Sequence, residues 1–364
     1  MNPRDARVVL LGLDGFPLAA LGPDRTPILW RLGGNGGRAS FTGIAPLPST
    51  TYPGFATLLT GCLPARHLVR TTGLRPGAVP GWAGRQDPAV QTLLEICAES
   101  GRRTTAVVGD HLLQGVLRLG EATIWPPGGI IPAGTPLDAH GYPPNEAARP
   151  HLLEAVADET VELVFGHLNE TDTWGHDLGP DHPTTLACAT AVDAIIGEVV
   201  EALRPTWSHA VLIVTSDHDM EAPSPLPPIE LRPSEPPLEG LVQSVTVDGG
   251  AALLRPVGGA SVRAVRAALS NTDGIHLVEE SGDVMVAGAV PGRWFAGAPQ
   301  PAGGFHGGPA TARTLAIVAG GHPVVPRLAA ALAASPPHLA DWGPTICGLL
   351  GLPARPMDGA DLAA

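Results

Sequence analysis

The sequence has 364 residues, 44% of them hydrophobic, which suits one large α/β domain with or without a modest insertion. The formal net charge is −13 and all 22 basic residues are arginine, which argues against non-specific binding to nucleic-acid polymers or to anionic membranes. An anionic small-molecule substrate is still compatible with this charge, because bound metal ions would dominate the local field.

The cysteines and the N-terminus bear on the cellular compartment. Cys62, Cys97, Cys188 and Cys347 form no CxxC pair, and the last three lie in apolar helical patterns typical of small core residues. Residues 1–7 lead directly into a strand, which leaves no room for the apolar region of a signal peptide. No apolar run reaches the roughly 18 residues of a membrane span. We therefore expect a soluble, cytoplasmic enzyme; its oligomeric state is left open.

The chain alternates strand and helix patterns, which predicts an α/β fold with a mostly parallel central sheet flanked by helices. Residues 75–88 and 125–148 are rich in proline and glycine, and we expect surface loops there. Strands are predicted at 8–13, 39–45, 104–108, 161–165, 211–214 and 314–319. Helices are predicted at 26–32, after Thr51, and at 89–100, 111–119, 149–158, 184–203 and 342–350.

A second, smaller unit is predicted at 222–300. It opens with a proline-rich stretch at 222–238 and continues with a hairpin around Asp248-Gly-Gly, at 242–247 and 251–254. A helix at 262–269 and short strands at 275–278 and 283–287 complete a small α+β cap. We expect this cap to choose the substrate, because it is inserted between His218 and His306. The catalytic domain would then comprise 1–221 and 301–364.

Three apolar strands lead to acidic residues. Because parallel strands of an open α/β sheet bring their carboxyl ends to one edge, these acids should meet there. The candidate ligands are Asp14, Asp172, His176, Asp217, His218 and the late His306. Three aspartates and three histidines provide two sets of three ligands, which is the chemistry of a two-zinc site with an open position for substrate.

Three successive hydroxyls, Ser49, Thr50 and Thr51, precede Pro53 and a short helical pattern. A hydroxyl at a helix N-terminus lies where backbone N–H groups favour an anion, so it can serve as a nucleophile. The same position is also that of an ordinary helix cap, and the two roles are geometrically compatible.

These motifs, taken together, resemble the alkaline phosphatase superfamily, and specifically its nucleotide pyrophosphatase/phosphodiesterase and phosphonoacetate hydrolase branch. The likeness runs almost from end to end. It rests on Leu-Asp14-Gly, Thr51-Tyr-Pro-Gly-Phe-Ala-Thr-Leu-Leu-Thr-Gly, Asp172-Thr-Trp-Gly-His176, Ser-Asp217-His218, Gly-Phe-His306-Gly and Asp341-Trp-Gly-Pro-Thr.

The resemblance implies an alkaline-phosphatase-like fold and two Zn²⁺ ions, with other divalent transition metals as alternatives. One zinc would be held by Asp172, His176 and His306, and the other by Asp14, Asp217 and His218. Thr51 would be the nucleophile that forms a phosphothreonine intermediate. His67 would lie behind the ligands, and Tyr52 would lie beside a base or an apolar leaving group.

The resemblance leaves the substrate open. The diesterase branch has an asparagine that steadies a phosphate oxygen, where this chain has Thr71 and Thr72, and Asp219 replaces a usual glycine. A monoester needs a cation near phosphorus, and only Arg66 and Arg70 are close to the nucleophile motif in sequence. We therefore expect a phosphodiester or nucleotide-type small molecule, with a phosphomonoester or a phosphonate as the alternative.

Other classes fit less well. Cys62-Leu-Pro-Ala-Arg66 matches the C-x-P-x-R pattern of sulfatases, but in those relatives it occupies the nucleophile position that Thr51 holds here. A phosphoglycerate-mutase-like phosphotransferase would normally have serine as nucleophile and a much larger insertion. A binding protein without activity would be expected to have lost at least one ligand, and none is missing.

Overall fold

A seven-stranded sheet forms the centre of the molecule. The computed structural model describes residues 6–34, 42–72, 88–119, 122–258 and 260–364. The strand order is β2-β11-β6-β1-β5-β3-β4. Each neighbouring pair in the part of the sheet that runs β6-β1-β5-β3-β4 is parallel, whereas β11 runs antiparallel to both β6 and β2. The strands are β1 (Arg7–Leu13), β2 (Thr42–Ile44), β3 (Thr104–Val108), β4 (Thr123–Trp125), β5 (Leu163–Leu168), β6 (Ala210–Ser216) and β11 (Arg313–Ala319).

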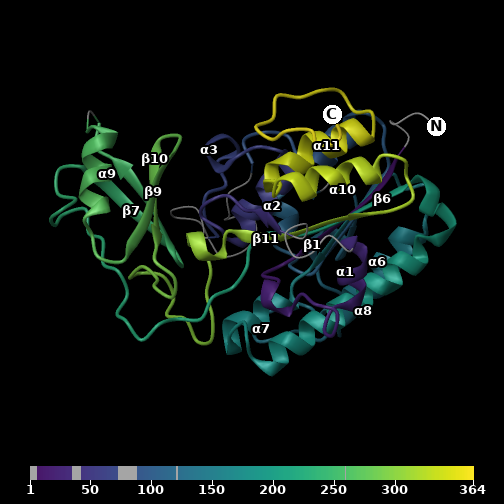
Figure 1. The fold of residues 1–364 in the computed structure, drawn as a ribbon, viewed down its shortest axis with the longest axis horizontal. Helices are drawn as coiled ribbons and strands as arrows, with labels where there is room; N and C mark the ends of the chain where they lie inside the picture. The colour runs from purple at the N-terminus through teal and green to yellow at the C-terminus, as the bar shows by residue number, and fades with distance from the viewer. Residues whose placement is uncertain (1–5, 35–41, 73–87, 120–121, 259) are drawn as a thin grey trace.

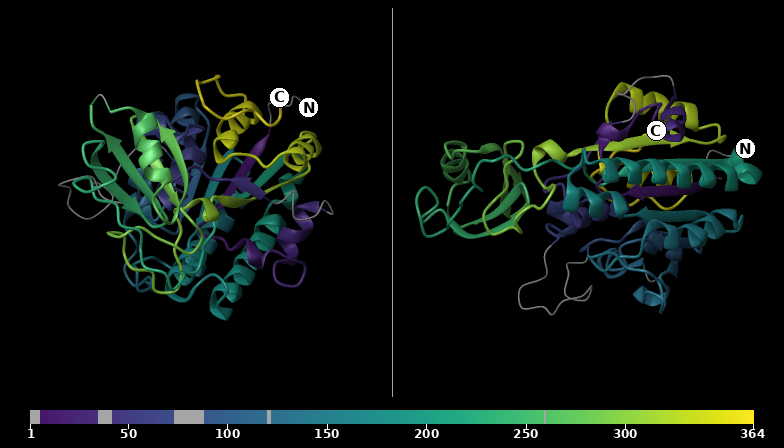
Figure 2. Two further views of the ribbon diagram at one scale, coloured as in Figure 1. Left: turned by 60° about the vertical axis from the view of Figure 1, so that its left-hand side comes forward. Right: turned by 90° about the horizontal axis from the view of Figure 1, so that it is seen from below.

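Helices cover both faces of this sheet (Figures 1 and 2). The first core contains side chains of α2 (Thr51–Thr60), α4 (Leu93–Glu99), α5 (Leu113–Val116), α10 (Val325–Ala334) and α11 (Trp342–Leu349). The second contains side chains of α1 (Pro27–Leu32), α6 (Asn145–Ala157) and α8 (Pro183–Ala202). Alternate residues of the central strands enter opposite cores: Val8 and Leu10 the first, Val9 and Leu11 the second. This two-sided burial explains why the strands read as continuous apolar runs and confirms the predicted mostly parallel α/β fold.

A four-stranded antiparallel sheet lies to one side of the main sheet (Figure 1). It has the order β7-β8-β10-β9, with α9 (Val262–Ser270) packed on it. Its strands are β7 (Val242–Asp248), β8 (Ala251–Pro256), β9 (Ile275–Ser281) and β10 (Val284–Ala289). All of them fall within the 222–300 range in which an insertion is predicted, and the hairpin around Asp248 is present.

Several element boundaries differ from prediction. The helix predicted at 89–100 begins at Leu93, because Thr92 and Glu95 form a capping box that fixes its first turn. The helix predicted at 111–119 is only one turn, at Leu113–Val116. Strand β5 extends to Leu168, beyond the predicted end at 165, because it pairs on both sides.

Other elements were missed by sequence patterns. Strand β4, helix α10, α7 (Glu170–Leu178) and the short α3 (Pro64–His67) were not predicted. Residues 39–41 of one predicted strand and most of the predicted loop at 75–88 lie outside the described residues. Short 3₁₀ turns are η1 (Leu18–Ala20), η6 (Pro127–Gly129), η7 (Arg204–His209), η8 (Pro309–Thr311) and η9 (Leu339–Asp341).

None of the described helices is both long and apolar enough to cross a bilayer. All four cysteines are buried thiols. Cys97 and Cys347 lie in the first core and Cys188 in the second, as small apolar residues would.

Candidate active site

The carboxyl edge of the sheet brings polar residues together. Leu13 is paired with Leu168 on one side and Ser216 on the other, so the residues that follow these strands emerge side by side. Asp14 follows β1 and Asp217 follows β6. Asp172 is reached after β5, on the first turn of α7. The predicted meeting of the strand-end acids is therefore present in the structure.

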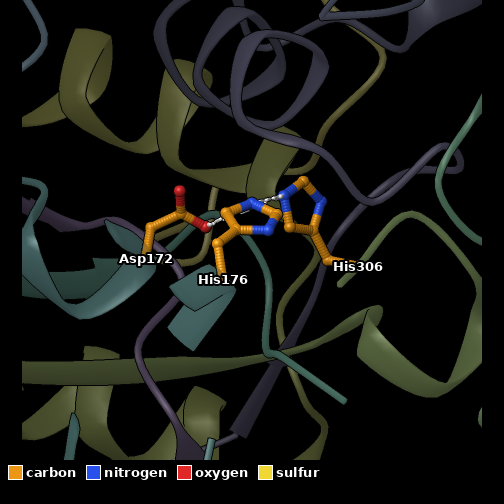
Figure 3. Close-up of side chains that lie close together, drawn as sticks. All are labelled: Asp172, His176 and His306. Atoms are coloured by element: carbon orange, nitrogen blue, oxygen red, sulfur yellow. Dashed lines mark hydrogen bonds and ion pairs between the residues drawn. The ribbon is translucent and has the colours of Figure 1, made fainter. Parts of the chain in front are cut away.

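Helix α7 places Asp172 and His176 one turn apart on one face. His306 comes from a distant loop, and the three side chains point toward one another (Figure 3). The Oδ1 atom of Asp172 lies 3.5 Å from His176 Nε2 and 3.7 Å from His306 Nε2. The two histidine Nε2 atoms are 3.0 Å apart. Three ligand atoms thus converge on one point.

A second cluster adjoins the first. Its ligand atoms come from Asp14, Asp172 and His218, all within 4.8 Å of one another. Asp217 belongs to the same cluster, since its Oδ2 lies 3.1 Å from His218 Nε2. Asp172 takes part in both clusters, an arrangement that sequence spacing did not indicate.

The hydrogen bonds of the histidines suit them as metal ligands. Nδ1 of His176 lies 3.2 Å from Gly304 O, and Nδ1 of His218 lies 3.0 Å from Asp219 O. A carbonyl only accepts, so each Nδ1 must carry the proton and each Nε2 keeps its lone pair toward the cluster. Burial lowers the pKa of His218 to about 4, which keeps this ring neutral.

The carboxylates also suit a cationic partner. Oδ1 of Asp172 and Oδ2 of Asp217 are buried and have no hydrogen-bond partner. Burial, and then the charges of Asp14 and Asp172, raise the pKa of Asp217 well above its ordinary value, and burial raises that of Asp14 to about 7. Divalent cations would remove this electrostatic cost. The donor set therefore fits the two metal ions that the sequence predicts.

Thr51 is the hydroxyl residue that faces this cluster. It is the first residue of α2, and its Oγ1 lies 3.3 Å from both Asp14 Oδ1 and His218 Nε2. Ser49 Oγ instead donates to Gly308 O at 2.8 Å. Thr50 Oγ1 donates to Asp248 Oδ2 at 3.2 Å. The two neighbouring hydroxyls therefore anchor the segment to other loops.

A cavity of about 190 Å³ opens over Thr51. Of the residues predicted to contact substrate, Tyr52 and Thr72 line it, and no arginine among the described residues does. Lining residues that sequence reasoning missed are Asp110, His140, Tyr142, Asn169 and Thr173. Asp110 follows Gly109 at the end of β3 and Asn169 directly follows β5, strand-end positions that could have indicated both residues; His140, Tyr142 and Thr173 carried no such signal.

The remaining predicted site residues lie elsewhere. Arg66 Nη1 pairs with Asp358 at 3.1 Å, and Arg70 Nη1 pairs with Asp283 at 2.6 Å. His67 is fully buried between α2 and the following turn, where its Nε2 lies 3.0 Å from Thr57 Oγ1 and its Nδ1 accepts from Val69 N. The structure does not bring these three residues to the cavity.

His167 is the buried contact behind the ligands that was not predicted. Its Nδ1 accepts from the backbone N–H of Asp110 at 3.3 Å, so its Nε2 carries the proton and donates to Asp14 Oδ2 at 3.1 Å. This bond leaves the other oxygen of Asp14 facing Thr51. In the sequence, His167 lies within an apolar strand pattern, at a position where a core residue is expected. Nothing in that pattern indicates that it belongs to a site.

Comparisons with known proteins agree with the fold. A family model described as type I phosphodiesterase / nucleotide pyrophosphatase matches residues 8–75 and 87–310. An uncharacterized pyrophosphatase/phosphodiesterase of Schizosaccharomyces pombe is 25% identical over 249 residues, 60% of this chain and 46% of that protein. The chain thus matches just under half the length of this curated relative.

Two solved structures share the fold. Murine ectonucleotide pyrophosphatase/phosphodiesterase 5, in an inactive form with AMP, superposes with a TM-score of 0.67 at 18% identity, covering 98% of this chain and 97% of that one. Phosphonoacetate hydrolase from Sinorhizobium meliloti, with phosphonoformate, gives 0.64 at 17% identity, covering 86% and 90%. With the family model matching most of its length, the chain belongs to the type I phosphodiesterase / nucleotide pyrophosphatase family.

Proposed function

We propose that this protein is a zinc-dependent phosphohydrolase that cleaves a phosphodiester or nucleotide-type small molecule through a phosphothreonine on Thr51. The observation that carries the proposal is the position of Thr51 Oγ1, 3.3 Å from Asp14 Oδ1 and from His218 Nε2 at the floor of the cavity. Family membership and the structural likeness to a pyrophosphatase/phosphodiesterase support the reaction class.

Two metal positions are part of this proposal. Asp172, His176 and His306 would hold one ion, and Asp14, Asp217 and His218 the other, with Asp172 close to both. Bound there, two divalent cations would supply the Lewis acidity that lowers the pKa of the Thr51 hydroxyl and neutralises charge on phosphorus.

The chain itself contributes orientation. The first turn of α2 directs backbone N–H groups toward the phosphoryl group, because Thr51 is its first residue. Thr51 Oγ1 attacks phosphorus in line and the ester oxygen leaves; water then hydrolyses the phosphothreonine and restores the hydroxyl. The bond from His167 to Asp14 Oδ2 holds that carboxylate in place during both steps.

The lining favours a diester over a monoester. A monoester carries an additional negative charge that a nearby cation must meet, and Arg66 and Arg70 are paired with aspartates away from the cavity. The structural likeness to a phosphonoacetate hydrolase supports phosphonate hydrolysis as the second candidate.

The sulfatase alternative has less support. Cys62 follows the C-terminal end of α2, and a helix of ten residues is about 15 Å long, so its thiol lies far from Thr51. Burial also raises the pKa of this thiol, which makes it a poor nucleophile.

The test compares an aryl phosphate monoester with the matching aryl diester, using zinc-loaded protein before and after exhaustive chelation. We expect hydrolysis that depends on metal and a higher kcat/KM for the diester. A monoester preference of roughly tenfold, about 1.4 kcal/mol in transition-state binding, would reverse the choice of substrate. Full activity without metal would overturn the proposal.

A further inference from the structure

The side-chain amide of Asn169 is buried in the wall of the cavity without a partner. The residue is 2% exposed, and neither Nδ2 nor Oδ1 has a hydrogen-bond partner. It lines the same cavity as Thr51. A buried amide without hydrogen bonds has lost its contacts with water and gained none in return, so a group that supplies these bonds would bind favourably.

Asn169 lies beside the metal ligands and outside their clusters. It directly follows β5, as Asp14 follows β1 on one side and Gly109-Asp110 follow β3 on the other. Neighbouring strands lie about 4.8 Å apart, so the amide faces a part of the cavity one to two strands beyond Asp14. If phosphorus is held at the metal ligands, this part of the cavity accommodates an organic group attached to it.

The amide is held by close packing. A Cβ added at Gly109 would lie 2.0 Å from Asn169 Oδ1, so a glycine is required where the amide lies against the end of β3. Nearby polar groups already satisfy one another. Tyr52 Oη donates to Asp110 Oδ2 at 3.1 Å, and Asp110 Oδ1 accepts from Leu112 N at 2.8 Å. Outside the two clusters of candidate ligands, Asn169 therefore keeps unmet hydrogen-bonding capacity in this wall.

The lining also restricts the charge of the organic group. It contains Asp14, Asp110 and Asp172, and no arginine among the described residues. The metal ions would balance the carboxylates that hold them, but Asp110 is outside both clusters. Among the described lining residues, an organic group with a carboxylate or a second phosphate would meet Asp110 and no arginine, whereas a neutral hydroxyl matches an amide that both donates and accepts.

We propose that Asn169 is a specificity-determining residue that binds a small, uncharged, hydroxylated group esterified to the phosphorus of the substrate. The assignment rests on the proposed function for the position of phosphorus. Asn169 Nδ2 donates to one hydroxyl oxygen of this group, and Oδ1 accepts from a hydroxyl proton. The cavity of about 190 Å³ has room for a group of a few carbon atoms.

The probes are 2,3-dihydroxypropyl 4-nitrophenyl phosphate and propyl 4-nitrophenyl phosphate, which carry the same charge and differ in two hydroxyls. Calorimetry with the zinc-loaded Thr51→Ala protein measures both dissociation constants without turnover. We expect the dihydroxypropyl ester to bind roughly tenfold more tightly, and this ratio to fall toward one when Asn169→Leu is added. Asn271→Leu, the same change at an exposed position, is the matched control and keeps the ratio.

Gly109→Ala provides a second arm, because it displaces the amide without removing it. It should also lower the ratio of the two dissociation constants toward one. If Asn169→Leu does not fold, Gly109→Ala serves as the test by itself. An unchanged ratio, an equal loss of affinity for both esters, or no preference in the parent protein would overturn the assignment. Turnover of either ester by the wild-type protein tests the proposed function separately, since the binding ratio needs no hydrolysis.

Discussion

The Nε2 atoms of His176 and His306 lie 3.0 Å apart, although the two residues are 130 positions apart in the chain. The Nδ1–H of His176 donates to Gly304 O, in the loop that carries His306. The lone pair of His176 therefore faces the ring of His306, with Asp172 Oδ1 alongside. Nitrogen atoms in this arrangement are best stabilised by a shared cation.

Metal content should depend on which ligand is removed. Asp172 Oδ1 takes part in both clusters, whereas His306 belongs to one. We expect Asp172→Ala to reduce bound metal from about two ions per chain to below one, and His306→Ala to reduce it to about one. Elemental analysis after dialysis measures this, with Asp24→Ala at an exposed site as control. Equal losses in both variants would contradict the shared role of Asp172.

Removal of the Thr51 hydroxyl should abolish turnover. We expect Thr51→Ala to lower kcat by on the order of 10³-fold or more, because no other hydroxyl in the segment faces the ligands, while metal content is largely kept. Ser49→Ala and Thr50→Ala should be milder, since their hydroxyls bind Gly308 and Asp248. If Thr50→Ala were the inactive variant, the nucleophile would be assigned one residue too late.

The second sheet should affect metal binding as well as substrate choice. Gly249, in the turn between β7 and β8, has φ +55°, and a Cβ there would lie 2.0 Å from His306 O. The backbone N–H of Gly250 also donates to His306 O at 2.8 Å. Gly249→Ala should therefore displace the His306 loop and weaken metal binding.

A metal-buffer titration of Gly249→Ala, read as zinc occupancy, measures that effect; we expect roughly a tenfold loss of affinity at one site. Gly258→Ala is the matched control, because a Cβ there meets nothing within 4 Å. Unchanged affinity in Gly249→Ala would mean that the insertion acts on the substrate alone, as sequence reasoning expects for 222–300.

The buried His67 should make the free energy of unfolding decrease at acidic pH. Burial, and then the charge of Arg70, lower the pKa of His67 from 6.5 to about 3. Between these values the unfolded chain binds a proton that the folded chain does not, so stability falls as pH decreases through this window. The slope from this one residue is up to about 1.4 kcal/mol per pH unit.

His67→Gln keeps a polar side chain beside Thr57 but removes the titration. Its free energy of unfolding in urea should therefore change less between pH 6.5 and pH 4 than that of the wild type. His209→Gln, at an exposed position, serves as control. A pH profile identical to the wild type would show that His67 is protonated in the folded state.

Much of the fold could be predicted from sequence, and so could the meeting of the candidate ligands at one edge of the sheet. Buried parallel strands are nearly continuous apolar runs, so β1, β5 and β6 stand out, and the polar residues that follow them must meet at one edge. Element boundaries were less predictable. Residues 89–92 lie before α4, because the capping box at Thr92 fixes where the helix begins although the apolar pattern starts earlier. The buried residues of α7 are Thr171, Thr173 and Gly175, so this helix has no apolar stripe for a sequence pattern to detect.

The sequence by itself determined the α/β class, the order of the ligands and the hydroxyl segment, because each depends on local pattern and chain order. Tertiary structure alone decided that Asp172 adjoins both clusters, and it placed the hydroxyl of Thr51, which the resemblance implied as nucleophile, against the candidate ligands. It also decided that Arg66 and Arg70 pair with aspartates away from the cavity. Asn169 likewise looks like any polar strand end in sequence, and only close packing against Gly109 leaves its amide buried and unpartnered beside the site. These features depend on contacts between residues far apart in the chain, which no local spacing encodes.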